Sequence, residues 1–128
     1  MSKDPVLISW EGDSLEVLRS FPFDVRQDVG AALRKLQQGE IPPNIRPMKS
    51  VGSGVFEVKE QDQRAWYRVI YLSKVKDTIY VLHCFEKESA KTERVDLETA
   101  RLRLVRVQRR LLEEKKNEKR KSKVKKSD

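Results

Sequence analysis

Three strand-like segments joined by short polar connections constrain the fold of this 128-residue chain more than any other feature. Each segment is rich in β-branched and aromatic residues: 55–59 (VFEVK), 66–72 (WYRVIYL) and 79–85 (IYVLHCF). The connections, residues 60–65 and 73–78, are polar and short enough for hairpins. The sequence therefore predicts three consecutive antiparallel strands.

The segments before this block predict one more strand and two helices. Residues 6–10 (VLISW) are short, apolar and β-branched, which is typical of a strand, and residues 14–19 can form a short helix. The next helix starts at Pro22 and ends near Gln38-Gly39, where glycine can supply the C-terminal cap. Its apolar residues recur at helical spacing: Val25, Val29, Ala32 or Leu33, and Leu36.

Prolines and a second apolar stripe complete the expected order of elements. Three prolines within residues 41–47 exclude a helix or a central strand there. A last helix is expected to start near Asp96, as its N-cap, with one apolar stripe: Leu97, Ala100, Leu104, Val107 and Leu111. The order predicts an α+β fold, in which an N-terminal helical hairpin and a C-terminal helix pack on a small antiparallel β-sheet.

We expect one domain, residues 1–112, followed by a basic C-terminal tail, residues 113–128. The tail is rich in lysine and has no apolar stripe, so it is expected to be either disordered or a solvated extension of the last helix. The whole chain has 28 Lys and Arg residues against 20 Asp and Glu residues, a net charge of +8. This excess favours an anionic partner such as nucleic acid, an acidic protein or a membrane surface.

Cysteine and histidine are too scarce for disulfide or common metal chemistry. Cys84 and His83 are the only residues of their types, which excludes an internal disulfide and an ordinary Cys/His zinc site, and no cofactor is expected. His83 alternates with Ile79, Val81 and Phe85, so we expect it on their sheet face as a hydrogen-bonded core residue, and Cys84 as a small buried apolar residue. No apolar segment resembles a signal peptide or a membrane span, so we expect a cytoplasmic protein.

Arg68 lies inside an otherwise aromatic and β-branched strand, where a charge is costly unless it has a partner. By alternation it shares a sheet face with Trp66, Ile70 and Leu72. Two explanations stay open. The guanidinium can present a fork of donors to a phosphate, or it can form an ion pair with a glutamate on a neighbouring strand, such as Glu57.

Further cations lie near Arg68 in the sequence. Lys87 and Lys91 follow the last strand of the block, while Lys49 precedes the block and Lys59 and Arg64 lie within it. Such a set of cations can stabilise an anionic transition state.

Several motifs occur in an order that is typical of one protein family. Met48-Lys49 precedes a glycine-rich bend, VFEVK matches the strand "lwElR", WYRVIY matches "yRvfY", and IYVLHCFEKESAKT matches "ivlLhgFkKKtqkTp"; Ala100-Arg101 fits the final helix. In these motifs residues 4–105 resemble the RelE/ParE superfamily of toxins, in particular its phage-derived HigB-like branch. Lys59 replaces the arginine of the first strand motif, and Glu88 stands where a second lysine is usual.

The resemblance implies a RelE-like toxin fold and the toxin component of a type II toxin–antitoxin system. It implies a ribosome-associated mRNA endoribonuclease that cleaves by metal-independent 2′-OH attack on the adjacent phosphate, a reaction whose transition state gains negative charge that preorganised cations stabilise. With this activity, the candidate catalytic residues are Arg68, Lys87 and Lys91, and the candidate RNA-binding residues are Lys49, Lys59, Arg64 and Tyr67. The implied partners are mRNA, the ribosome and a helix-turn-helix antitoxin, with no membrane and no small-molecule cofactor. Two other functions stay open: a ParE-like inhibitor of gyrase, and a nucleic-acid-binding regulator without enzymatic activity.

Overall fold

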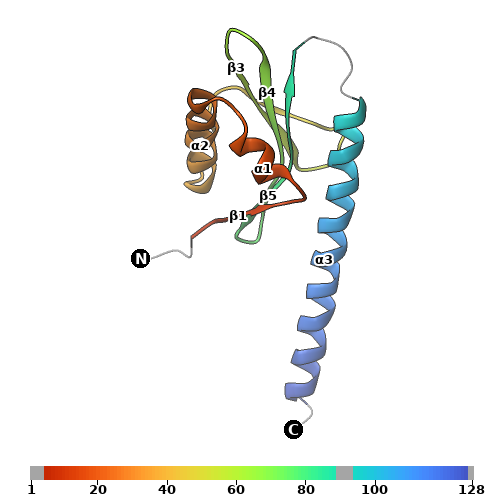
Figure 1. Cartoon of the computed structure of the whole chain (residues 1–128). Coiled ribbons are helices and arrows are strands. Elements are labelled where there is room, and N and C mark those ends of the chain that lie inside the picture. The colour runs from red at the N-terminus through yellow and green to blue at the C-terminus, as the bar shows by residue number, and fades with distance from the viewer. Residues whose placement is uncertain (1–4, 89–93, 127–128) are drawn as a thin grey trace.

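One sheet with helices on both of its faces makes up the computed structural model, which describes residues 5–88 and 94–126 (Figure 1). The predicted α+β class and the two N-terminal helices are confirmed. The elements in chain order are β1 (Leu7–Trp10), α1 (Ser14–Arg19), α2 (Phe23–Gln37), β2 (Ile45–Pro47), β3 (Val55–Gln61), β4 (Trp66–Val75), β5 (Thr78–Lys87) and α3 (Arg94–Lys126).

The sheet has the strand order β1-β5-β4-β3-β2. The three predicted strands form the antiparallel meander β3-β4-β5, and β2 adds to it antiparallel to β3. The antiparallel sheet expected from the sequence gains one parallel edge, because β1 pairs with β5 in parallel, with Leu7 opposite Thr78. Parallel strands need a long connection between them. Because α1 and α2 follow β1 in the chain, β1 can pair in parallel with β5 at the edge of the meander.

The proline-containing segment provides an edge strand that the sequence did not indicate. Prolines exclude a central strand, but an edge strand tolerates them where the missing N–H would face outward. Pro47 is the last residue of β2, which borders β3 alone. Asn44 enters the strand with φ of 63°, in the left-handed region that asparagine tolerates better than most residues.

Each face of the sheet has its own hydrophobic core. Beneath α1 and α2 the core includes Val25 and Val29 from α2 and Val69 from β4. Beneath α3 it includes Leu104 and Ile70. Full burial of an aliphatic side chain stabilises a fold by about 1.5–3 kcal/mol, so both helical layers contribute to holding the sheet.

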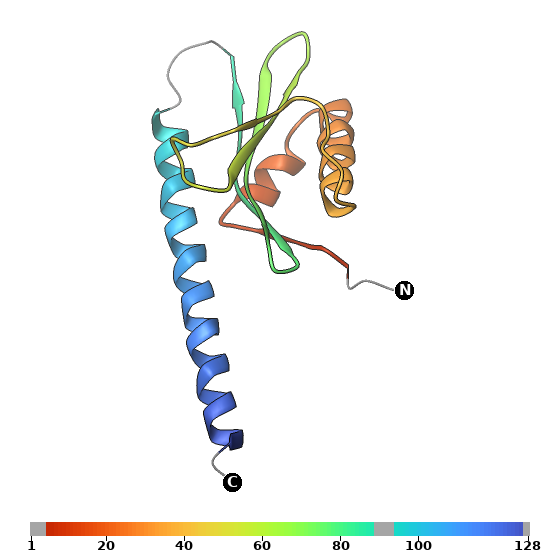
Figure 2. The same ribbon diagram turned by 180° about the vertical axis from the view of Figure 1, so that it is seen from behind.

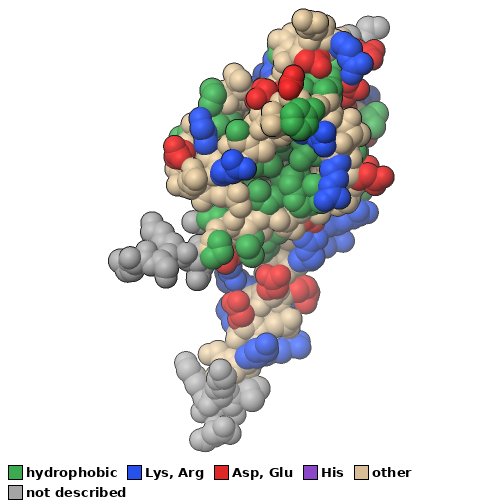
Figure 3. Space-filling model, turned by 60° about the vertical axis from the view of Figure 1, so that its left-hand side comes forward, with side chains coloured by type: hydrophobic (Ala, Val, Ile, Leu, Met, Phe, Trp, Pro, Cys, Tyr) green, Lys and Arg blue, Asp and Glu red, His purple; other side chains and the backbone are tan. Residues whose placement is uncertain are grey.

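The two faces differ in how completely they are covered. Seen from the side of α2, apolar side chains gather in the middle of the surface, with basic and acidic side chains around them (Figure 3). Partly buried apolar residues packed against the core on this side include Ile8, Trp10, Val17 and Leu36. This face of the molecule therefore retains accessible apolar surface, a common property of protein-binding surfaces.

A bulge in β5 changes which residues share a face. Ile70 pairs with His83 whereas the next residue, Tyr71, pairs with Val81, so Leu82 is extra in the register. His83 consequently lies on the face that α3 covers, and Val81 lies on the other. The prediction that His83 shares a face with Val81 is wrong, because simple alternation fails across the bulge.

The C-terminal helix extends beyond the sheet that it covers (Figures 1 and 2). Its expected apolar stripe is confirmed, with Ala100, Leu104 and Val107 buried. Asp96 lies in the first turn and is not the N-cap, since α3 already begins at Arg94. From Leu112 onward the described side chains are exposed. Within the described part of the chain, no helix is long and apolar enough to cross a membrane.

Candidate functional site

A buried carboxylate between two arginines lies at the centre of the candidate site. Glu57 on β3 is 0% exposed. Its Oε1 lies 3.0 Å from Nε of Arg46 on β2, and its Oε2 lies 3.2 Å from Nη1 of Arg68 on β4. The ion pair considered for Arg68 from the sequence is thus present.

This cluster explains how an arginine is tolerated in an apolar strand. A buried guanidinium or carboxylate that loses its partner is strongly destabilising, but Glu57 has cations on both sides. Three charges then sum to one net positive charge. Arg68 itself is largely covered, with 8% of its side chain exposed, whereas 54% of the Arg46 side chain is exposed. The cluster therefore presents its positive charge mainly through Arg46.

Further cations lie next to this cluster on the same sheet face. Lys59 on β3 is the direct cross-strand partner of Arg68, and Lys87 on β5 is the partner of Trp66. The Lys59 ammonium lies 4.3 Å from the centroid of the Trp66 ring, a cation–π contact. The structure thus brings together three of the predicted site residues, Arg68, Lys59 and Lys87, around an aromatic ring.

An open groove of about 530 Å³ runs along this end of the sheet. It lies between β2 and the tip of the β3–β4 hairpin, and Arg46 connects it to the buried cluster. Its lining combines cations, side-chain amides and one aromatic ring: Asn44, Ile45, Arg46, Lys59, Glu60, Gln61 and Trp66. Such a mixture can bind a ligand that has both anionic and aromatic parts.

Tyr67 and Arg64 lie away from this surface. Tyr67 is buried in the core beneath α1 and α2, and its hydroxyl donates to Asp62 Oδ2 at 3.0 Å. Burial raises the pKa of the Tyr67 phenol. Arg64 is exposed in the turn between β3 and β4, where it lines a hollow with Tyr67 and Glu86 on the α1 side. The structure does not bring these two predicted RNA-binding residues to Arg68.

The remaining predicted residues are placed less centrally or fall outside the described residues. Lys49 is exposed in the turn after β2, beside Ser50, whose carbonyl accepts a hydrogen bond from Arg101 Nε of α3 at 2.7 Å. Lys87 is half-buried at the end of β5. Lys91 lies outside the described residues.

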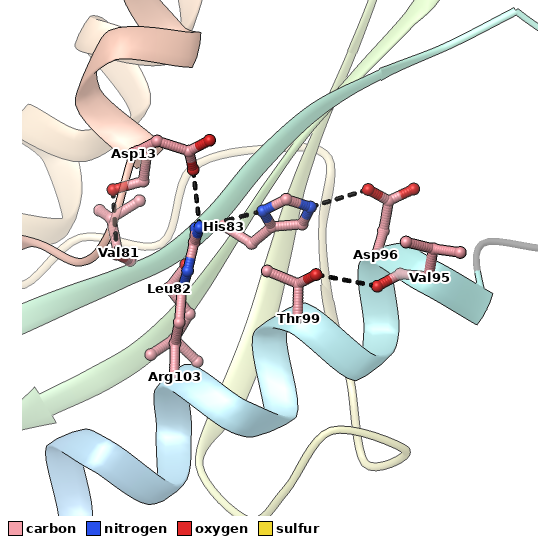
Figure 4. Close-up of polar contacts among 9 residues, drawn as sticks. Asp13, Val81, Leu82, His83, Val95, Asp96, Thr99 and Arg103 are labelled. Carbon is pink, nitrogen blue, oxygen red and sulfur yellow. Dashed lines mark hydrogen bonds and ion pairs between the residues drawn. The ribbon is translucent and has the colours of Figure 1, made fainter.

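His83 is enclosed in a polar network that links α3 to the sheet (Figure 4). Its Nε2 lies 2.7 Å from Asp96 Oδ1, and its Nδ1 lies 3.4 Å from Arg103 Nη1. With the proton on Nε2, the ring donates to Asp96 and accepts from Arg103. Both ring nitrogens are therefore engaged, and His83 acts as a structural residue, as expected from the sequence.

Arg103 extends the same network to the loop before α1. Its Nη1 also donates to the Leu82 carbonyl at 3.0 Å, and its Nη2 donates to Asp13 Oδ1 at 2.7 Å. The hydrogen bond from Arg103 lowers the pKa of the Asp13 carboxyl. A Cβ at Gly12 would come within 2.5 Å of the Arg103 guanidinium, and Gly12 has φ of +54°, so glycine is needed there.

Sequence reasoning missed Arg46 and Arg103 as members of these clusters. Arg46 lies between prolines, where no strand register could be assigned before β2 was known. Arg103 lies at the edge of the apolar stripe of α3, and a lone arginine there is common on solvated helices. One feature of the sequence could have indicated that Arg103 contacts the sheet: it lies within one helical turn of Ala100 and Leu104, which belong to the predicted apolar stripe.

Known proteins resemble this chain in sequence and in fold. The model of the family "Phage derived protein Gp49-like (DUF891)" matches residues 16–105. A mutant of the E. coli toxin RelE in the free state has a TM-score of 0.57 and 14% sequence identity, over 80% of this chain and 99% of that chain. The isolated E. coli RelE toxin has a TM-score of 0.47 and 17% sequence identity, over 76% of this chain and 98% of that chain. Among curated proteins no sequence matches. The predicted RelE-like fold is confirmed.

Proposed function

The chain belongs to the phage-derived Gp49-like family and has the fold of a RelE-superfamily toxin, and on this basis we propose that it is the toxin of a type II toxin–antitoxin system that cleaves mRNA on the ribosome. One observation carries the nuclease part of the proposal. Arg68, Lys59 and Lys87 share one sheet face beside an open groove. A helix-turn-helix antitoxin and a cytoplasmic location belong to the same proposal.

The proposed reaction is an internal transfer at phosphorus. The ribose 2′ hydroxyl gives its proton to a solvent water molecule, its oxygen forms a bond to the adjacent phosphorus, and the bond from phosphorus to the 5′ oxygen breaks. The products are a 2′,3′-cyclic phosphate and a 5′-hydroxyl. The main requirement is stabilisation of charge on the phosphorane oxygens, which preorganised cations supply.

Each cation has a distinct role in this proposal. Glu57 fixes the Arg68 guanidinium so that it contacts a non-bridging phosphate oxygen without reorganising. Lys59 neutralises the neighbouring phosphate, and Lys87 donates a proton to the departing 5′ oxygen. Lys91, predicted from the sequence, would add a further cation on the chain that follows β5.

The test is to map RNA 5′ ends in a translating extract that contains the purified protein. We expect codon-phased cuts with 5′-hydroxyl ends, and a fall in cutting of about a hundredfold or more in Lys87→Met. The control is Arg34→Gln, since Arg34 is exposed on α2, which covers the opposite face of the sheet. Intact mRNA with the wild-type protein would refute the nuclease, and double-stranded DNA breaks would point to gyrase.

One observation favours a second candidate, an RNA-binding regulator without nuclease activity. Arg68 is largely covered and already paired with Glu57, which limits its contact with a substrate. In that case the groove and the basic end of α3 bind RNA and nothing is cleaved. The same extract distinguishes the two functions, because the regulator would bind RNA stably and leave its 5′ ends unchanged.

A further inference from the structure

We propose that the groove between β2 and the β3–β4 hairpin is a nucleotide subsite, in which a base stacks on Trp66 and its phosphate contacts Arg46 and Lys59. The inference rests on the proposed function in that it takes RNA as the natural ligand. It adds a binding site and its ligand class.

The size and lining of the groove fit one nucleotide. Its volume of about 530 Å³ falls within the range of small-molecule sites. Two side chains, Asn44 and Gln61, carry amides that can both donate to and accept from a base edge. The groove is open along one side, so a nucleotide within a strand could enter it.

Trp66 is placed as a binding residue and not as a packing residue. Among the described residues it belongs to neither hydrophobic core, whereas Trp10 packs against the core beneath α1 and α2. Its cross-strand partners are the polar residues Gln61 and Lys87. An aromatic ring that lines a groove among cations and amides is the usual platform for stacking a base.

The phosphate contacts follow from the buried cluster. Glu57 accepts from Arg46 Nε at 3.0 Å and so holds the Arg46 side chain at the groove, while more than half of it remains exposed. The Lys59 ammonium lies over the Trp66 ring, 4.3 Å from its centroid. A base that stacks on this face displaces the ammonium from the ring toward the phosphate, while Arg46 is already held at the groove, so both cations lie within reach of a phosphate attached to the base.

The experiment uses tryptophan fluorescence of the full chain. Trp10→Phe leaves Trp66 as the one tryptophan, since the chain has two. The probes are AMP, UMP, ribose 5-phosphate and inorganic phosphate. We expect AMP to quench the emission saturably, and to bind roughly tenfold more tightly than ribose 5-phosphate, because one stacked base is worth about that factor. UMP should also bind more tightly than ribose 5-phosphate, because every base has a face that can stack.

A second variant separates loss of stacking from loss of folding. Trp66→Phe should keep most of the affinity for AMP in competition with a labelled oligonucleotide, whereas Trp66→Ala should lose about tenfold with an unchanged circular dichroism spectrum. Equal affinities for AMP and ribose 5-phosphate, or no quenching in Trp10→Phe, would overturn the subsite. Saturable AMP binding without mRNA cleavage would support the subsite and refute the nuclease; cleavage without AMP binding would do the reverse.

Discussion

At the scale of single residues, Glu57 determines whether the candidate surface exists. It is fully buried, and it holds one arginine inside the sheet and another at the groove. Coulomb attraction compensates for the desolvation of Glu57 and Arg68 only while both are present. Arg46, Arg68 and the groove therefore depend on a single side chain.

Replacing Glu57 with glutamine should cost about 3–5 kcal/mol of unfolding free energy, because the buried Arg68 then loses the carboxylate that lies 3.2 Å from its Nη1. Denaturant unfolding measures this cost. The control is Glu98→Gln, which removes an exposed pair with Arg94 and should cost less than about 1 kcal/mol. Equal losses in the two variants would contradict the structural role of Glu57.

Another residue-scale feature limits the chemistry available to the chain. Burial raises the pKa of the Cys84 thiol to about 12, so the thiol stays protonated at physiological pH. The expectation that Cys84 is a buried apolar residue agrees with its place in the core beneath α1 and α2. The cationic groove is thus a better candidate for chemistry than the one cysteine.

At the scale of elements, α3 is held on the sheet by polar contacts as well as by its apolar stripe. The single side chain of Arg103 makes three of these contacts, to the Leu82 carbonyl of β5, to His83 and to Asp13. His83 and Asp96 form the second link from β5 to the first turn of α3. The first turn of α3 is thus anchored to β5, the strand whose last residue is Lys87.

Arg103→Met should loosen α3 while keeping its apolar contacts. The loss of a charge-assisted hydrogen bond to Asp13, together with an unsatisfied buried carbonyl at Leu82, should destabilise the fold by about 1–3 kcal/mol. Hydrogen exchange of the α3 amides should accelerate. Arg106→Met, which changes an exposed arginine of the same helix, serves as the control. Unchanged exchange in Arg103→Met would show that the apolar stripe suffices.

The elements also show where sequence reasoning reaches its limit. Periodicity located the meander and α2, because apolar residues recur there at regular intervals. It failed at the β5 bulge, since one extra residue, Leu82, reverses the alternation. It also failed at β2, whose pairing with β3 depends on tertiary contacts of Arg46 and not on propensity.

The candidate site was predictable in part for the same reasons. Strand parity placed Arg68 with Glu57, and hairpin register then brought Lys59 and Lys87 alongside. Tyr67 was predicted as an RNA-binding residue, but alternation along the strand places it on the opposite sheet face from Arg68. Arg46 and the groove were not predictable, because they depend on a loop conformation that begins with the left-handed Asn44.

At the scale of the whole molecule, the net charge of +8 is unevenly distributed. The far part of α3 is exposed and carries Lys115, Lys116, Lys119 and Arg120. Such a helix can contact phosphates without regard to sequence. Removing four phosphate contacts should flatten the dependence of log K on log salt by about 0.7 per contact for single-stranded RNA.

The charge prediction is tested by changing these four residues to glutamine and measuring RNA binding by anisotropy at several salt concentrations. The slope should fall, while AMP quenching of Trp66 stays unchanged. An unaltered slope would mean that the far part of α3 is only a solvated helix.

The most direct test of the central claim, that this charge cluster serves RNA cleavage and not only folding, is a single-turnover cleavage measurement on the double variant Glu57→Leu/Arg68→Met. Replacing a buried ion pair with apolar residues of similar volume is often neutral for stability, so the variant should fold. We predict a native-like melting transition with a loss of cleavage of about a hundredfold or more. A folded double variant that cleaves mRNA at the wild-type rate would contradict the account.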